Sequence, residues 1–142
     1  MKFIAYVSQA IAPFDAEELQ HLLERSRARN TADGITGLLI YRYNDEYGRG
    51  NFLQFLEGPE TRIEEVWERI ANDDRHHSVI VVEEGRSEKR MFSDWSMGFR
   101  NVEEFDLRDF PGFADMGSDA FWRRAENNAL PEALDLLRSF CD

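Results

Sequence analysis

The stretch NFLQFLEGP, residues 51–59, has the composition of a strand that is buried on both faces. Its large apolar residues are Phe52, Leu53, Phe55 and Leu56. Gln54 stands in their middle, with two amide donors and one carbonyl acceptor that need partners. The segment therefore predicts a central strand, and it raises the question of what its amide binds.

The composition of the whole chain indicates a single domain. A chain of 142 residues with 42% hydrophobic content can bury one good core and is too short for two ordinary domains. Its formal net charge of -11 would repel a polyanion, and its basic residues are scattered along the chain. We therefore expect no nucleic-acid partner.

The cysteine content and the hydropathy bear on the compartment. Cys141 is the only cysteine, which excludes an internal disulfide and a cysteine-based metal cluster and fits a reducing environment. In the first residues, MKFIAYVSQA, the short apolar run alternates with polar residues too soon for the apolar core of a signal peptide. No window approaches the ~18 continuous apolar residues of a membrane span. We expect a cytoplasmic protein without a membrane segment.

Around residues 51–59, strand and helix patterns alternate along the chain. The expected elements are a strand at 3–7, a helix from 16 to about 30, strands at 35–41 and 51–57, a helix from 62 to 71, and strands at 78–84 and 91–99. The polar segment 42–50 is expected to be an exposed loop that joins a hairpin. This order predicts an α+β, ferredoxin-like βαββαββ sandwich with both helices on one face of a mainly antiparallel sheet.

Two capping boxes mark the expected helix starts. Asp15 with Glu18 opens the first helix, and Phe14 can pack on Leu19 as a hydrophobic staple. Thr61 with Glu64 gives the same pattern before the second helix.

The last forty residues are expected to cover the second face of the sheet. Segments 53–55 and 79–82 are apolar on both strand faces, so the face away from the two helices also needs a cover. The tail carries ten large apolar residues: Phe105, Leu107, Phe110, Phe113, Phe121, Trp122, Leu130, Leu134, Leu137 and Phe140. We expect a domain at 1–102 and a cap of short helices at 103–142; the alternative is that the tail forms a partner-binding surface.

Several polar residues fall on faces that should be buried. In the first helix, the apolar stripe continues into Ser26 and Asn30. On the strands, Tyr6 and Gln54 lie on faces that would point toward the helices. An unpaired buried amide costs roughly 1 to 3 kcal/mol, so Asn30 should bind either a backbone group or a ligand. Together these groups predict an apolar pocket with a few convergent polar groups, which is the usual form of a small-molecule site.

Charged and soft side chains should surround this pocket. Arg69 and Asp73 are four residues apart and are followed by Arg75, His76 and His77. This group can form either a solvated ion pair with a histidine-tipped helix end or an anion site at the pocket mouth. A metal site is not expected, because the adjacent His76 and His77 diverge and no third ligand is evident. Trp95 and Met97 are two apart on the expected last strand and so should share a face, either as core or as the wall of a flat ligand site.

The chain resembles the BLUF family, sensors of blue light using FAD. The resemblance covers residues 1 to about 100 in unbroken order, and each fragment that carries it is short. The fragments are YVS at Tyr6, SRARN followed by GITGLLIY, FLQFLEGP, RIANDDRHH and FSDWSMGF.

The resemblance implies a noncovalent flavin between the two helices, with FAD favoured and FMN or riboflavin possible. Tyr6 and Gln54 match the family's photoactive pair, with Trp95 and Met97 matching the residues that alternate beside the glutamine. The other implied cofactor-binding residues are Ser26, Asn30, Phe52, Arg69, Asp73 and His76. In the family, excitation moves an electron and a proton from the tyrosine to the flavin, and the glutamine amide ends rearranged. The long segment 42–50 departs from the family's usual tight turn.

The expected output is a change in protein–protein contacts, sensed through Met97, the last strand and the tail. A homo-oligomer is expected and the downstream partner is unknown. One competing hypothesis is a ferredoxin-like regulatory domain that binds a small molecule without photochemistry. An acylphosphatase-type enzyme shares the fold, but no phosphate-cradling glycine-rich loop follows residues 3–7, so we expect no enzyme activity.

Overall fold

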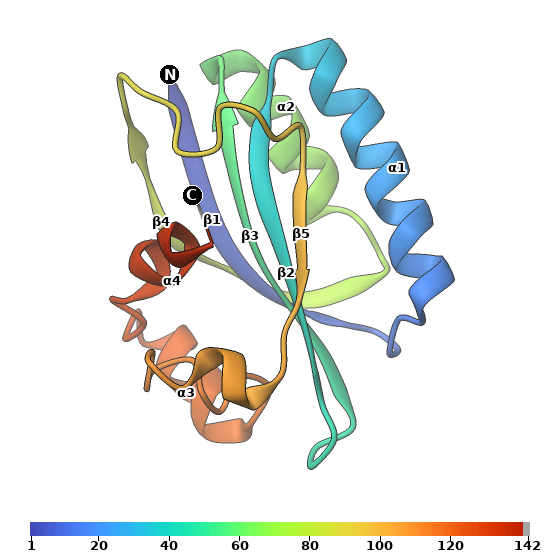
Figure 1. Ribbon diagram of the computed structural model, residues 1–142, viewed down its shortest axis with the longest axis vertical. Helices are drawn as coiled ribbons and strands as arrows, with labels where there is room; N and C mark the ends of the chain where they lie inside the picture. Colours follow the sequence, from blue (N-terminus) through green and yellow to red (C-terminus); the bar gives the residue numbers. More distant parts are fainter. Residues whose placement is uncertain (141–142) are drawn as a thin grey trace.

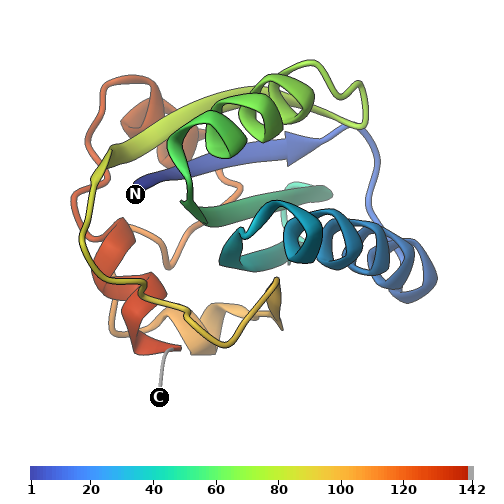
Figure 2. The same cartoon turned by 90° about the horizontal axis from the view of Figure 1, so that it is seen from above.

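The computed structural model describes residues 1–140, and Cys141, on which the expectations about disulfides and metal clusters rest, lies outside them. Its elements are β1 (Lys2–Ala10), α1 (Ala16–Asp33), β2 (Thr36–Asn44), β3 (Arg49–Gly58), α2 (Glu60–Ala71), β4 (His76–Arg86), β5 (Gly98–Asn101), a 3-10 turn η1 (Glu104–Leu107), α3 (Asp119–Glu126) and α4 (Ala133–Ser139). They build one sheet with helices on both of its faces (Figures 1 and 2).

The sheet has the strand order β4-β1-β3-β2-β5. β1 pairs antiparallel with β3 and β4, β2 pairs antiparallel with β3, and the short β5 lies parallel to β2 at the edge. This confirms the predicted α+β, ferredoxin-like arrangement. Residues 51–59 form most of the central β3, as their apolar composition predicted.

The α1 helix begins where its capping box predicted. The Asp15 side chain accepts from the backbone N–H of Glu18, and the Glu18 side chain accepts from that of Asp15. The helix ends at Asp33, three residues later than expected, because Gly34 closes it with a left-handed φ of 70°.

The predicted capping box of α2 is wrong. That helix begins at Glu60 with Pro59 as N-cap and no side-chain cap, so Thr61 is already inside its first turn. Proline fixes φ near the helical value and needs no N–H partner at this point, which allows the earlier start.

Strand alternation divides the core between the two faces of the sheet. One cluster lies under α1 and α2 and includes Ile4, Leu39, Leu56 and Ile63. The other lies under the tail, where Val7, Ile40, Leu53 and Phe55 meet residues such as Phe113, Phe121 and Leu137. The tail therefore packs on the sheet as core, and Figure 2 shows α1 and α2 on the opposite side from α3 and α4.

The expected loop at 42–50 is wrong, because both strands continue into it. β2 extends to Asn44 and β3 starts at Arg49, so only a four-residue turn joins them, with Gly48 at φ 64°. The extension has tertiary partners: Asn44 Nδ2 donates to the carbonyl of Met116 at 2.9 Å, and Arg49 pairs with Asp119 at 2.9 Å. Bonds to the tail hold these residues in an extended conformation.

A second set of contacts joins the same hairpin to α3. Trp122 Nε1 donates to Asn51 Oδ1 at 3.2 Å. Gly117 has φ 97°, and a Cβ there would come within 2.4 Å of Asn51 Nδ2, so this close approach requires glycine.

The expected strand at 91–99 is also wrong in most of its length. β5 contains only Gly98–Asn101, and residues 91–97 form bends and turns. The backbone N–H groups of Met91 and Phe92 donate to the Glu57 carboxylate and not to a neighbouring strand.

Within residues 1–140, no helix is long and apolar enough to cross a membrane.

Candidate functional site

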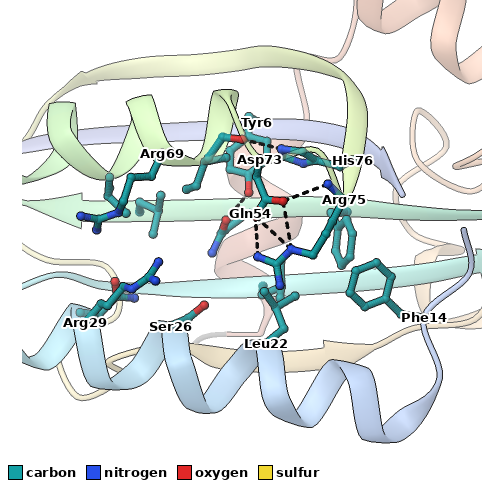
Figure 3. A pocket seen from close by; sticks show the side chains of 16 residues that line it. Tyr6, Phe14, Leu22, Ser26, Arg29, Gln54, Arg69, Asp73, Arg75 and His76 are labelled. Carbon is teal, nitrogen blue, oxygen red and sulfur yellow. Dashed lines mark hydrogen bonds and ion pairs between the residues drawn. The ribbon is translucent and has the colours of Figure 1, made fainter. Parts of the chain in front are cut away.

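A cleft opens between α1 and α2 above the sheet (Figure 3). It encloses about 820 Å³ of empty space, part of which is open solvent. In Figure 3, Leu22, Ser26 and Arg29 come from α1 and Arg69 from α2, on opposite sides of the strands that carry Tyr6 and Gln54. Its apolar walls include Phe14, Leu39, Phe52, Leu56, Val66 and Ile70.

Tyr6 and Gln54 meet at the floor of this cleft. They are direct cross-strand partners on β1 and β3, so their side chains project from the same face of the sheet. The Tyr6 hydroxyl donates to Gln54 Oε1, and Gln54 Nε2 donates to Met97 Sδ at 3.5 Å. Both side chains are buried, with 4% and 6% of their surface exposed. The amide in the apolar strand thus binds a phenol on one side and a thioether on the other.

The surroundings of Tyr6 keep its phenol protonated. Burial raises the pKa of Tyr6 above its ordinary value, and the negative charge of Asp73 raises it further. The Tyr6 ring also contacts Trp67 edge to face, with 5.2 Å between the ring centroids.

His76 stands next to Tyr6 and is fixed by two hydrogen bonds. Its Nε2 lies 2.6 Å from the carbonyl of Ile70, and its Nδ1 lies 3.0 Å from Ser8 Oγ. Because a carbonyl only accepts, Nε2–H is the donor, and Nδ1 is free to accept from the Ser8 hydroxyl. The imidazole thereby holds the end of α2 against β1.

The buried Asn30 has found the backbone partner that its burial required. Its Nδ2 donates to the carbonyl of Ser96 at 2.7 Å, and only 3% of its surface is exposed. Ser26, one turn earlier on α1, lines the same cleft. The α1 side of the cleft is therefore tied to the segment that precedes β5.

Arg69 and Asp73 do not form the ion pair that was one of the two alternatives for them. Asp73 accepts hydrogen bonds from Arg75 Nε at 3.0 and 3.1 Å, and Arg69 lies 3.9 Å from Asp33 instead. Asp73 lies beyond the end of α2, where the chain turns toward β4, so helical i, i+4 spacing no longer applies. The hydrogen bond from Arg75 lowers the pKa of Asp73 from 3.8 to about 2.

Sequence reasoning missed Arg29 at the cleft and named Arg75 only within a possible anion site at the pocket mouth, not among the cofactor-binding residues. Arg29 lies one residue before Asn30, and a helical-wheel position at the edge of the stripe could have indicated it. Within residues 1–140, its guanidinium has neither an ion pair nor a hydrogen bond to the protein. In a chain of net charge -11, three arginines line this cleft.

Trp95 and Met97 do not share a strand face, so that expectation is wrong. Both precede β5, where the turns of residues 91–97 break the period-two alternation of a strand. Met97 is 2% exposed and packs in the cluster of Tyr6, beside Gln54. Trp95 packs on the opposite cluster, stacked on Phe92 with 5.4 Å between the ring centroids, and does not line the cleft.

The described residues contain no candidate metal site. Among residues 1–140, no group of three or more His, Cys, Asp or Glu side chains could hold a metal ion. The cleft instead suits a flat, largely apolar ligand with hydrogen-bonding edges and an anionic end, because its floor and walls are aromatic and aliphatic and its rim carries guanidinium groups.

A family model described as "Sensors of blue-light using FAD" matches residues 1–98. The chain belongs to the BLUF family. It therefore carries a blue-light sensor domain that uses FAD, and the predicted resemblance is confirmed.

Relatives of this BLUF domain include parts of much larger proteins. The photoactivated adenylate cyclase subunit beta of Euglena gracilis is 30% identical over 80% of this chain, which spans only 12% of that protein. The blue light- and temperature-regulated antirepressor BluF of Escherichia coli is 26% identical over 65% of this chain and 20% of its own length.

Solved BLUF structures share the fold over almost the whole chain. The structure of BlsA in its photo-activated state has a TM-score of 0.70 and 26% identity and covers 97% of this chain and 95% of its own. The dark-state structure of the BLUF protein BlrB has a TM-score of 0.73 at 24% identity, with 97% and 92% covered, and that likeness concerns the fold.

Proposed function

We propose that this chain is a photoreceptor in which Tyr6 and Gln54 form the light-driven switch, and that it signals to a partner protein without turning over a substrate. The observation that carries the proposal is the buried hydrogen bond from the Tyr6 hydroxyl to Gln54 Oε1 at the floor of the cleft. This bond joins a phenol to a reorientable amide at the floor of the cleft between α1 and α2.

Different residues of the cleft would contact different parts of a bound flavin. Phe52, Ser26 and Asn30 would contact the ring with Tyr6 and Gln54, and Asp73 and His76 would lie toward the sugar chain. The Arg29, Arg69 and Arg75 guanidiniums are the cations that would meet phosphate groups. When bound, the flavin supplies the absorption of blue light.

The amide of Gln54 can exchange its hydrogen bonds without creating charge. In the described arrangement its carbonyl oxygen accepts from Tyr6, and its NH₂ group points to the sulfur of Met97, which is a weak acceptor. A reoriented amide presents NH₂ to the Tyr6 oxygen and the carbonyl to Met97. Tyr6 then changes from donor to acceptor toward Gln54, so the two arrangements are distinct states.

Burial keeps these two states separate. Tyr6 and Gln54 are only 4% and 6% exposed, so water has little access to either hydrogen bond, and each bond is stronger than it would be in water. The raised pKa of Tyr6 keeps the proton on the phenol in the dark, so the donor that Gln54 needs is present.

The signalling part of the proposal rests on the kind of protein in which relatives of this domain occur. The Euglena relative is named as a subunit of a photoactivated cyclase and the Escherichia coli relative as an antirepressor. We infer a sensor at residues 1–102 whose tail at 103–142 passes the change to a cytoplasmic protein partner, in a homo-oligomer. The single Cys141 fits that reducing compartment.

The absorption spectrum of the FAD-loaded protein before and after blue light tests the proposal. We expect a reversible red shift of the oxidised flavin band, and we expect Tyr6→Phe and Gln54→Leu each to abolish it while FAD stays bound. Tyr41→Phe is the matched control, because Tyr41 is equally buried, is not a cleft residue, and accepts from the Phe14 N–H through its hydroxyl. A normal shift in Tyr6→Phe or Gln54→Leu would contradict the mechanism.

A further inference from the structure

Glu57 is a buried carboxylate that the cleft does not use. It lies on β3 three residues after Gln54, has 2% of its surface exposed, and is absent from the residues that line the cleft. Three residues along a strand place it on the opposite face of the sheet from Gln54. A buried charge requires compensation, so its partners are informative.

All the partners of the Glu57 side chain are donors. Oε1 accepts from the backbone N–H of Met91 at 2.7 Å. Oε2 accepts from the N–H of Phe92 at 2.7 Å and from the Thr36 hydroxyl at 2.9 Å. Three donors on two oxygens suit a carboxylate and not an amide, because an amide would direct its own N–H groups at one of these donors. Glu57 thus fastens the start of segment 91–97 to β3.

At the other end of this segment, three consecutive backbone carbonyls accept hydrogen bonds from β2 and α1. The Trp95 carbonyl accepts from the N–H of Gly37 at 3.0 Å. The Ser96 carbonyl accepts from Asn30 Nδ2 at 2.7 Å, and the Met97 carbonyl accepts from Arg27 Nε at 2.9 Å. Residues 91–97 are therefore clamped between β3, β2 and α1, and the Met97 side chain packs from this segment into the cluster under α1 and α2, beside Gln54.

We propose that Glu57 is a positioning residue of the photoswitch: by binding the backbone of Met91 and Phe92 it sets where Met97 meets Gln54. Gln54 and Glu57 sit on the same strand, so the carboxylate ties the position of Met97 to the strand that carries the switch. The N–H···S contact at 3.5 Å favours the amide orientation in which the carbonyl faces Tyr6. This inference rests on the proposed function, because it names a residue that acts on the same switch from the far face of the sheet.

The test uses the FAD-loaded full chain with Glu57→Gln, Met97→Leu and the double variant. We expect Glu57→Gln to bind FAD normally, to show a smaller light-induced red shift, and to return to the dark state about fivefold more slowly, the factor for losing one hydrogen bond worth about 1 kcal/mol. Met97→Leu should act in the same direction. If Glu57 acts through Met97, the double variant should be no slower than Met97→Leu alone.

Hydrogen exchange supplies a readout that does not depend on light. The amide hydrogens of Met91 and Phe92 should be protected in the wild type and exchange faster in Glu57→Gln, with or without FAD. Glu83→Gln makes the same chemical change at an exposed position of β4. It should alter neither the rate of return to the dark state nor the hydrogen exchange of Met91 and Phe92. Should Glu57→Gln fail to fold, Thr36→Val removes one hydrogen bond from the same carboxylate and should give a smaller effect of the same sign.

Three results would overturn the inference while leaving the photoreceptor intact: an unchanged or faster return in Glu57→Gln, additive effects in the double variant, or unchanged exchange at residues 91–92. Failure of the proposed function looks different, because the wild type itself would then lack the reversible shift.

Discussion

The two faces of the sheet are built from the same strands and serve different ends. Under α1 and α2, the strands contribute Tyr6 and Gln54 to the floor of an open cleft. Under the tail, the alternate residues of the same strands meet a closely packed set that includes Phe113 and Phe121, both fully buried. One face keeps polar groups available for a ligand, whereas the other supplies the burial that stabilises the fold. Substitutions on the two faces should therefore separate photochemistry from stability.

The largest expected effect on stability is that of Phe121→Ala on the tail face. Phe121 is fully buried against Phe113 and Trp122, with ring centroids 5.7 and 5.5 Å away. Its truncation should lower the free energy of unfolding by about 3–5 kcal/mol. Urea denaturation measures the loss, and the folded fraction should keep a normal light-induced red shift.

Phe105→Ala is the control for this experiment, because Phe105 has 69% of its surface exposed and, among the described residues, its ring stacks only against the Arg108 guanidinium. It should cost less than about 1 kcal/mol. A lost red shift in folded Phe121→Ala would show that the faces are not separable in this way.

An intermediate effect is expected at the junction of β3 with α3. Asn51→Ala leaves the Trp122 N–H and the carbonyls of Arg42 and Arg49 without the amide that they bind. Unpaired buried groups should reduce the free energy of unfolding by about 1–3 kcal/mol. Thermal and urea unfolding measure this, with the exposed Asn101→Ala on β5 as control. Equal stability of the two variants would mean that the hairpin does not depend on the tail.

The smallest effect should come from Asp73→Asn at the cleft. The folded-state pKa of Asp73, about 2, lies below its ordinary value of 3.8, so the carboxylate stabilises the fold above the ordinary value and loses this contribution as the pH falls toward 2. Because the Asp73 side chain is partly exposed, with 26% of its surface accessible, solvent screening limits the cost of Asp73→Asn to less than about 1 kcal/mol at neutral pH.

Urea denaturation at neutral pH and midway between the two pKa values checks this prediction. The difference between Asp73→Asn and the wild type should shrink at the lower pH, and the exposed Asp109→Asn should show no such pattern. A difference that grows on acidification would reverse the assigned sign.

Most of the fold was predictable because it depends on local patterns. Strand alternation placed Tyr6 and Gln54 on one face and Leu53 and Phe55 on the other, and the Asp15 cap set the start of α1. The burial of these residues follows from their own sequence neighbourhood, so no tertiary information was needed.

The errors occur where distant partners decide the conformation. Residues 91–97 read as a strand, but Glu57 takes the backbone donors that a strand would offer to its neighbour. The polar segment 42–50 read as a loop, but Asn44 and Arg49 bind the tail and stay extended. Side-chain to backbone bonds over 34 to 72 residues leave no period in the sequence.

The candidate site was predictable to a similar degree. Tyr6, Gln54, Asn30, Ser26, Phe52, Arg69, Asp73 and His76 all line the cleft, as expected from the pattern and the resemblance. Arg29 was missed, since an exposed arginine on a helix looks like an ordinary surface residue, and Arg75 was named only within a possible anion site. Which of these residues contact FAD stays a prediction.

The tail that covers the second sheet face also limits how small a usable light sensor can be made from this chain. A fragment cut at residue 98, where the family match ends, would leave the far sides of β1, β2 and β3 bare, with Val7, Ile40, Leu53 and Phe55 facing water. An apolar sheet face of this kind drives self-association. A minimal sensor for fusion to other proteins must therefore retain the chain through α4, although none of residues 99–139 lines the cleft.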